Sequence, residues 1–134
     1  MSKLGCKCGH VIRDQTDRIR YKARLLPDCD DEFVFEAIAR ECDALVDAIV
    51  AGDRESWLQR HFLKRYPRLL SNGEFFKDFV EGLFIDRGRT AYECEACGRL
   101  YLQRPGTDNE FIAFVPESGK IEHMLEPLSE HRAD

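Results

Sequence analysis

The chain has 134 residues, of which 43% are hydrophobic and 34% are charged, and its formal net charge is −5. A chain of this size can bury a hydrophobic core as one domain, and no stretch approaches the roughly 18–20 apolar residues that a membrane-spanning helix needs. The first five residues lead into a cysteine motif without an apolar leader, so we expect a cytoplasmic protein with reduced thiols. Residues 1–25 carry a net charge of +5 and residues 26–60 carry −7, which argues against uniform attraction to nucleic acid.

The N-terminal segment is expected to be extended and to carry one half of a metal site. Cys6 and Cys8 are followed by Gly9, a pattern typical of a tight turn that directs two sulfurs at one cation. Residues 18–25 then alternate between basic and apolar side chains, which is the period of a half-buried strand. The apolar face holds Ile19, Tyr21, Ala23 and Leu25, and the basic face holds Arg18, Arg20, Lys22 and Arg24.

Two interpretations of this basic face remain open. Four cationic side chains on one strand face can contact nucleic-acid phosphates, with Tyr21 or Tyr101 as candidates for base stacking. Alternatively, the face is solvated or pairs with neighbouring carboxylates, as exposed charges commonly do.

A long helix is predicted from residue 31 to residue 51. Acidic residues at its start favour the positive end of the helix dipole, and Gly52 ends it. An apolar stripe at helical spacing predicts a central helix that packs on more than one side, with Cys42 as a buried, inert thiol. The stripe consists of Val34, Ile38, Cys42, Leu45 and Ile49, widened by Phe35, Ala39, Val46 and Val50.

The same region carries a dense set of acidic side chains. They are Asp28, Asp30, Asp31, Glu32, Glu36, Asp43 and Asp47. A surface of this charge fits a basic protein partner, such as a toxin domain that degrades nucleic acid, because opposite charge steers association. The alternative is that these acids compensate the helix dipole and coat a solvated face. Cys29 lies in this acidic loop, which argues against a reactive thiolate.

Two further helices complete the predicted helical segment. The second begins at Asp53 and ends before Pro67, with His61 on its apolar face. We expect His61 to be a hydrogen-bonded core residue and not a metal ligand. Ser71 and Glu74 have the spacing of a capping box, and the apolar residues that follow at helical spacing predict the third helix.

The chain is predicted to return to extended structure near Thr90. Residues 90–94 and 99–104 form a hairpin whose turn holds the second cysteine motif, and residues 111–115 form another strand. Residues 118–134 form an acidic tail that contains His123 and His131. We expect this tail to be partly mobile. Its apolar residues, which fit a short docking helix, are Ile121, Met124, Leu125 and Leu128.

The two cysteine motifs predict one structural Zn²⁺ site. Its four ligands are Cys6, Cys8, Cys94 and Cys97. Closing the intervening loop costs about 4 kcal/mol of chain entropy, whereas a structural zinc contributes about 10–16 kcal/mol of apparent binding free energy. A disulfide framework conflicts with reduced thiols, and a redox dithiol at Cys94 and Cys97 lacks a surrounding βαβ pattern.

The coordination shell also bears on catalysis. Four thiolates leave no open position on the metal, so a catalytic zinc requires water in place of one cysteine, and we expect no enzyme. His10 is either a substitute ligand for the first motif or a neighbour that hydrogen-bonds near the thiolates.

The motifs Cys6-Lys7-Cys8-Gly9 and Cys94-Glu95-Ala96-Cys97-Gly98 resemble the paired knuckles of the zinc-ribbon superfamily, over about a third of the chain. The first motif has one intervening residue where the family usually has two. A metal that joins them implies an α+β fold in one domain. Residues 1–26 and 88–117 then form a small antiparallel zinc-ribbon sheet, and residues 28–86 form a three-helix insertion packed against it.

In its overall character the chain is also similar to uncharacterised bacterial proteins that accompany toxins as immunity partners. This similarity favours a non-enzymatic protein of immunity or adaptor type that occludes a partner protein through its acidic helix, without a membrane. The alternative is a zinc-ribbon regulator that binds nucleic acid through the basic strand face. Zinc ribbons serve many functions, so the motif alone does not choose between them.

Overall fold

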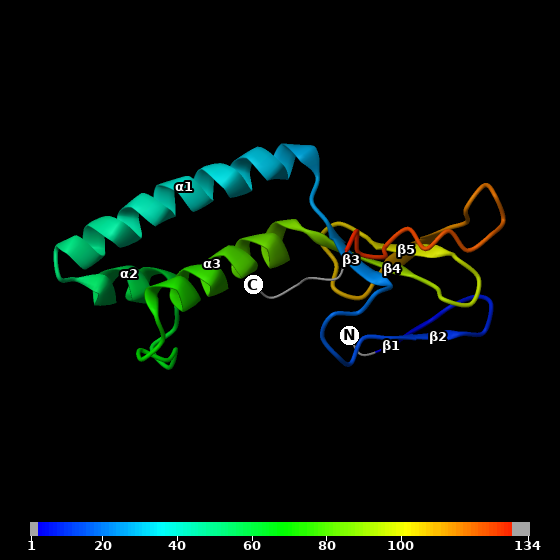
Figure 1. Cartoon of the computed structure of the whole chain (residues 1–134), viewed down its shortest axis with the longest axis horizontal. Coiled ribbons are helices and arrows are strands. Elements are labelled where there is room, and N and C mark those ends of the chain that lie inside the picture. Colours follow the sequence, from blue (N-terminus) through cyan, green and yellow to red (C-terminus); the bar gives the residue numbers. More distant parts are fainter. Residues whose placement is uncertain (1–2, 130–134) are drawn as a thin grey trace. The chain divides into compact units, whose positions relative to one another are not determined.

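The structure is a computed structural model that describes residues 3–129. It has three helices and two antiparallel sheets, which confirms the predicted α+β class (Figure 1). The chain divides into two compact units. The sheet unit combines the residues up to Leu25 with those from Arg89 onward, and the helical unit spans Leu26–Gly88. The predicted packing of the helices against the sheet stays a prediction.

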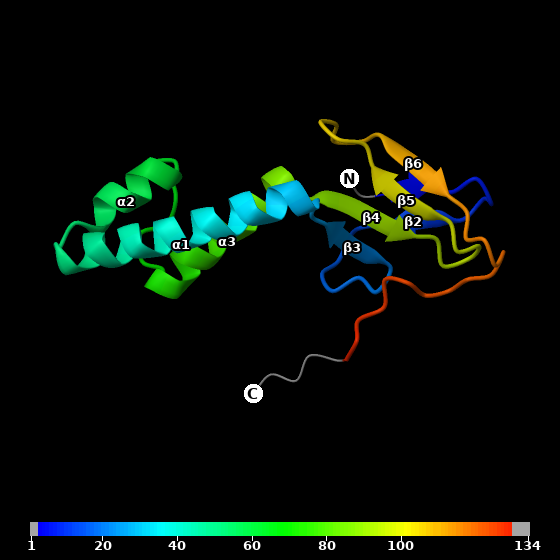
Figure 2. The same ribbon diagram turned by 90° about the horizontal axis from the view of Figure 1, so that it is seen from above.

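The sheet unit contains six strands in two sheets (Figure 2). Strand β1 (Lys3–Gly5) pairs with β2 (Val11–Arg13) in a hairpin. Strands β3 (Lys22–Leu25), β4 (Arg89–Glu93), β5 (Leu100–Gln103) and β6 (Phe111–Phe114) form the second sheet in that order. N- and C-terminal segments therefore pair through β3 and β4, as the sequence predicts, while the first knuckle lies on a hairpin of its own.

The two sheets share one buried core. Ile12 of β2, Tyr92 of β4 and Tyr101 of β5 are almost fully buried together with Cys6 and Cys94. This burial of apolar and aromatic surface stabilises the pairing of the two sheets.

A half-buried ion pair joins the end of the hairpin to the second sheet. The Lys22 ammonium lies 2.6 Å from the Asp14 carboxylate, which also accepts a hydrogen bond from the Tyr92 hydroxyl. Burial opposes ionisation of Asp14, but the hydrogen bonds from Lys22 and Tyr92 outweigh it and lower the pKa of the carboxyl.

The strand predicted over residues 18–25 is shorter than its alternating pattern indicates. Only Lys22–Leu25 is extended and paired, and Arg18 has a left-handed φ of 59°. The Lys22 N–H donates to the Ile19 carbonyl at 3.3 Å, in a turn that directly precedes the strand. The Tyr21 hydroxyl donates to the Arg13 carbonyl at 2.5 Å. Arg18 and Arg20 therefore precede the strand, and the prediction of a four-residue basic ladder on one strand face was wrong.

The helical unit contains α1 (Asp28–Val50), α2 (Arg54–His61) and α3 (Asn72–Arg87). Helix α1 begins three residues earlier than predicted, directly after the extended Pro27, and no side chain caps it. The caps of the other two helices are confirmed. Asp53 accepts from the Ser56 N–H, and Ser71 and Glu74 form both hydrogen bonds of a capping box.

A single carboxylate oxygen of α1 contacts three side chains of α2 in the helical unit. Glu41 Oε2 accepts from Trp57 Nε1 at 3.0 Å and from Arg60 at 3.1 Å, and lies 2.9 Å from His61 Nε2. Burial opposes its ionisation, but the hydrogen bonds from His61 and Trp57 lower the pKa of Glu41. The His61 ring packs 4.8 Å from the Phe79 ring, which confirms it as a hydrogen-bonded core residue.

Within the helical unit, helix α1 packs through one face, so the predicted packing on more than one side is not found in this unit. Val34, Ala37 and Leu45 are its buried residues, and they recur at helical spacing on the side that contacts α2 and α3. The opposite side is open, with Phe35 58% and Val46 52% exposed. Cys42 is exposed, so the prediction of a buried thiol was wrong, and Cys29 lies in the first helical turn and not in a loop.

The tail contains no helix over residues 116–129, which corrects the predicted docking helix. It contacts the sheet unit through its backbone instead. The Met124 N–H donates to Glu93 at 3.2 Å, and a Cβ at Gly98 would lie 3.0 Å from Ile121 Cα. His131 and the rest of 130–134 lie outside the described residues. No helix within the described range combines the length and apolar character needed to cross a membrane.

Candidate metal centre

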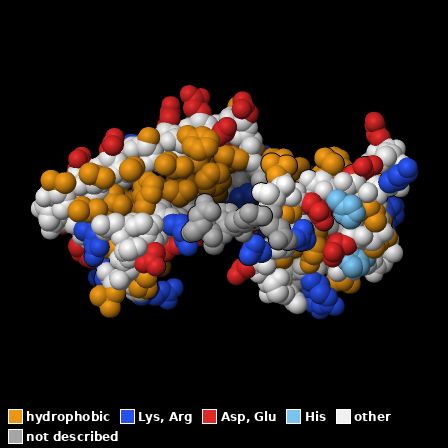
Figure 3. Space-filling model, in the orientation of Figure 1, with side chains coloured by type: hydrophobic (Ala, Val, Ile, Leu, Met, Phe, Trp, Pro, Cys, Tyr) orange, Lys and Arg blue, Asp and Glu red, His pale blue; other side chains and the backbone are white. Residues whose placement is uncertain are grey.

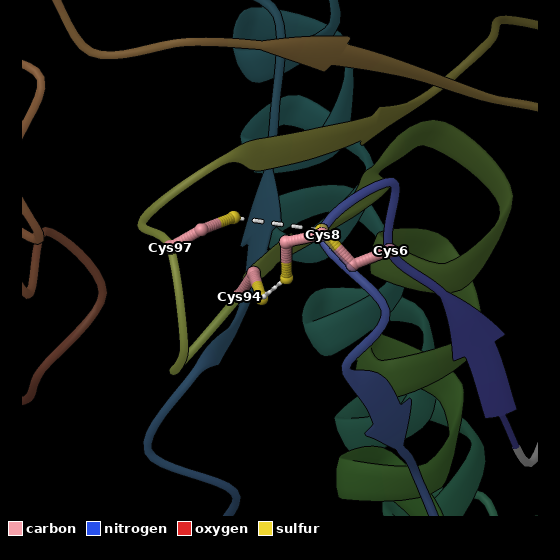
Figure 4. A group of neighbouring side chains, drawn as sticks. All are labelled: Cys6, Cys8, Cys94 and Cys97. Atoms are coloured by element: carbon pink, nitrogen blue, oxygen red, sulfur yellow. Dashed lines mark hydrogen bonds between the residues drawn. The ribbon is translucent and has the colours of Figure 1, made fainter.

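The structure brings the four predicted cysteine ligands together (Figure 4). Cys6 and Cys8 lie on the turn between β1 and β2, and Cys94 and Cys97 lie on the turn between β4 and β5. All four sulfurs lie within 4.8 Å of one another. The Cys6–Cys97 and Cys8–Cys94 sulfur distances are 3.5 and 3.7 Å.

These distances fit metal coordination better than any disulfide. Sulfurs placed about 2.3 Å from a tetrahedral centre are separated by about 3.8 Å, whereas a disulfide requires about 2.05 Å. The cysteines are free thiols in the structure. The group is therefore compatible with a metal ion held in a zinc-ribbon arrangement.

Both turns close in the same way despite their different lengths. The Gly9 N–H donates to the Cys6 carbonyl at 2.9 Å, and the Gly98 N–H donates to the Cys94 carbonyl at 2.8 Å. The φ angles of Gly9 and Gly98 are +99° and +79°, a region that L side chains rarely adopt. A glycine after each motif thus lets the chain fold back so that both sulfurs face the same point.

The thiols have unequal environments. Cys94 is fully buried, and this burial raises the pKa of its thiol to about 12. Burial also opposes ionisation of Cys6, but hydrogen bonds from the Tyr101 hydroxyl and the Cys8 N–H lower its pKa to about 6. For Cys97, donors on Arg99 outweigh burial and lower the pKa. Backbone and side-chain donors thus favour the thiolate, the form that binds metal, at Cys6 and Cys97.

Two residues that support the sulfurs were missed in the sequence. The Tyr101 hydroxyl donates to Cys6 Sγ at 3.2 Å and accepts from the Lys7 N–H at 3.1 Å. Arg99 donates to Cys97 Sγ at 3.3 Å. These donors offset the negative charge of a four-thiolate shell. The position of Arg99 directly after the second knuckle was an available signal, whereas Tyr101 is recognisable only once β5 faces the first turn.

The other candidate ligands lie outside the cluster. His10 contributes its backbone carbonyl, which accepts from the Cys6 N–H at 2.8 Å. Within residues 3–129 its ring makes no hydrogen bond, and it is not part of the cysteine group. Cys29 and Cys42 belong to α1 of the helical unit.

The acidic set lies along α1. Asp28, Asp30 and Asp31 occupy the first turn, where Asp30 pairs with Arg87 at 3.3 Å. Four others are exposed and have no hydrogen bond or ion pair with a side chain in the described part of the chain. We call these four the acidic column: Glu32, Glu36, Asp43 and Asp47.

The basic set is divided. Arg18 and Arg20 line a hollow of about 270 Å³ together with Lys22, whereas Arg24 is exposed on β3. Tyr101 is committed to the cysteine cluster through its hydroxyl, so it does not offer an open stacking surface.

Residues 2–118 match the model of a family described as a domain of unknown function, DUF8617. The chain belongs to the DUF8617 family. No curated protein and no solved structure matches the chain. The DUF8617 match includes both cysteine motifs and all three helices, so the candidate metal centre lies wholly within the family domain.

Proposed function

We propose that this DUF8617 protein is a non-catalytic binding protein that holds a structural Zn²⁺ and presents the acidic column of α1 to a basic partner protein. The observation that carries the proposal is the acidic column itself. Its four carboxylates are exposed, lie on one side of one helix and make no ion pair with a side chain among residues 3–129.

The metal part of the proposal rests on the donor set. Four thiolates at tetrahedral spacing favour Zn²⁺ and fill its coordination shell. A filled shell has no position for water or substrate, which supports a structural role and a non-enzymatic protein. The ion would join the β1–β2 turn to the β4–β5 turn and so fix the sheet unit.

Helix dipole compensation does not account for the acidic column. The dipole acts within the first turn, whereas Asp43 and Asp47 lie far beyond it, and Asp47 is close to the negative end of α1. The column also contains like-charged pairs four residues apart, Glu32 with Glu36 and Asp43 with Asp47. Each such pair destabilises a helix by about 0.2–0.5 kcal/mol. A cationic partner surface would remove this repulsion on binding.

The test compares three baits in affinity capture from the native host. The first is the wild type, and the second has the acidic column neutralised by Glu32→Gln, Glu36→Gln, Asp43→Asn and Asp47→Asn. The third is a control of equal net charge with four exposed acids of the sheet unit neutralised: Asp17→Asn, Asp108→Asn, Glu117→Gln and Glu126→Gln.

We expect the wild type and the control to retain the same basic protein, with a retention that falls as salt rises, and the column variant to lose it. Equal capture by wild type and column variant would refute the proposal. If the captured protein is a toxin, loss of its activity in the complex identifies an immunity protein. Retained activity identifies an adaptor.

A second candidate function is supported by the basic hollow. Arg18, Arg20 and Lys22 line one recess of the sheet unit, where they fit a phosphate backbone. Lys22 is already paired with Asp14, which weakens the case. Binding of a DNA duplex that is lost in an Arg18→Ala, Arg20→Ala double variant would support a nucleic-acid regulator. Absence of binding at low salt would remove this candidate.

A further inference from the structure

The open side of α1 carries a continuous apolar row. We call it the apolar seam: Phe35, Ala39, Cys42, Val46 and Ile49. All five are exposed, with Phe35 at 58%, Val46 at 52% and Ile49 at 38%. Figure 3 shows hydrophobic side chains gathered along the helical unit, with acidic side chains along one edge.

The spacing of the seam is that of a helix-pairing surface. Its members recur at intervals of four, three, four and three residues, the a/d pattern of a two-helix coiled coil. Val50, which is 83% exposed, extends the row. Exposed to these degrees, the seam presents roughly 500 Å² of apolar surface per chain. Two copies together can bury at most about 1,000 Å², which is the minimum size of a biological interface and corresponds to a weak dimer.

We propose that the seam is covered by a second copy of this chain, with the two α1 helices packed antiparallel. The middle of the seam is made of the small residues Ala39 and Cys42, and larger residues stand on either side. Two such helices can therefore approach closely at their centres while Phe35 and Val46 fill the outer layers.

Charge selects the antiparallel orientation. A parallel pair would set the two acidic first turns beside each other and align both helix dipoles. An antiparallel pair keeps the two acidic first turns apart and sets the two helix dipoles in opposite directions. Its axis lies at the middle of the seam, near Cys42.

The dimer has a consequence for the acidic column. Glu36, Asp43 and Asp47 lie about 80–120° around the helix from the seam, so antiparallel pairing gathers the columns of both copies on one side of the interface. Their mutual repulsion weakens as salt screens it. Self-association should therefore strengthen with salt, opposite to the binding of a basic partner. The inference is independent of the proposed function.

The test measures the mass of the full, zinc-loaded chain in solution by sedimentation equilibrium. We expect twice the chain mass, and we expect Val46→Asp, which buries a charge in the seam, to give the single-chain mass. Leu69→Asp is the matched control, because Leu69 is fully exposed outside α1. Both substituted side chains are exposed, so we expect the variants to fold. Circular dichroism verifies that they remain helical.

Orientation is read by linking thiols with a short bismaleimide. Cys42 lies near the expected axis, whereas Cys29 lies at the far end of the same helix. An antiparallel dimer links Cys42 to Cys42 and leaves Cys29 unlinked to its counterpart, as identified by peptide mass spectrometry. A link between two Cys29 residues, no Cys42 link, or a single-chain mass at every concentration and salt would overturn the proposal.

Discussion

Removal of the proposed Zn²⁺ should unfold the sheet unit and leave the helical unit intact. The two cysteine turns are far apart in sequence, so the ion must offset about 4 kcal/mol of loop entropy from a binding free energy of about 10–16 kcal/mol. The remaining 6–12 kcal/mol, roughly, is comparable to the whole stability of an average domain. The sheet unit has only a small core around Ile12, Tyr92 and Tyr101 and cannot replace that contribution.

The aromatic residues distinguish the two units. Trp57 is the single tryptophan of the chain and lies in the helical core with Tyr66, whereas Tyr21, Tyr92 and Tyr101 belong to the core of the sheet unit. After chelation we expect the near-ultraviolet dichroism of the tyrosines to fall, with the contribution of Tyr66 remaining, while tryptophan emission stays native. Cys94→Ser should reproduce the effect of chelation, and Cys29→Ser should not.

Cobalt substitution gives an independent readout of the same site. Four sulfur ligands produce an absorption spectrum distinct from that of three sulfurs and one oxygen. If the chelated protein retains its tyrosine dichroism and its unfolding midpoint, the metal does not stabilise the fold and the reasoning fails.

Three further substitutions test individual contacts. Glu41→Gln removes the carboxylate charge that accepts hydrogen bonds from Trp57, Arg60 and His61. It should destabilise the helical unit by about 1–3 kcal/mol at neutral pH, as measured by urea unfolding. Because the folded-state pKa of Glu41 is lowered, its stabilisation is complete above the unfolded pKa and is lost as the pH falls through the folded pKa, so wild type and variant should converge in acid. Gly98→Ala places a Cβ against the tail backbone at a positive φ and should destabilise the sheet unit by about 1–3 kcal/mol in thermal unfolding. Ser71→Ala removes half of the capping box and should cost α3 about 1 kcal/mol, measured by loss of helical dichroism on urea titration.

Matched controls make these results interpretable. Glu36→Gln changes the same charge on the exposed side of α1 and should shift stability by less than about 0.5 kcal/mol. Gly5→Ala meets no atom within 4 Å and should be tolerated. Equal effects of Glu41→Gln and Glu36→Gln would show that the hydrogen bonds to Glu41 contribute nothing. Similarly, a stable Gly98→Ala protein would contradict the close contact between knuckle and tail.

Much of this structure was accessible from local sequence patterns. Ligand type and spacing were sufficient to predict the cysteine cluster, because thiolates next to glycine turns have few other arrangements. The second and third helices were recognisable because Asp53 and Ser71 are strong caps followed by apolar residues at helical period.

The errors have a common physical origin in tertiary contacts. Alternation over residues 18–25 predicted a strand, but the left-handed Arg18 and a turn between Ile19 and Lys22 confine it to Lys22–Leu25. The spacing of apolar residues along α1 correctly placed Phe35 and Val46 in its apolar stripe. It did not show that these two side chains are left uncovered by the other helices of the unit. Periodicity identifies an apolar face, and only the fold shows whether that face is core or surface.

The pairing of Leu25 with Arg89 has a consequence for how this domain can diverge. The chain leaves β3 and returns on β4 at paired positions, so the helical unit is an insertion between two neighbouring strands. Lengthening, shortening or replacing this insertion leaves the strand register and the cysteine geometry unchanged. The helical unit can therefore change in length or sequence without disturbing the paired strands that carry the cysteines.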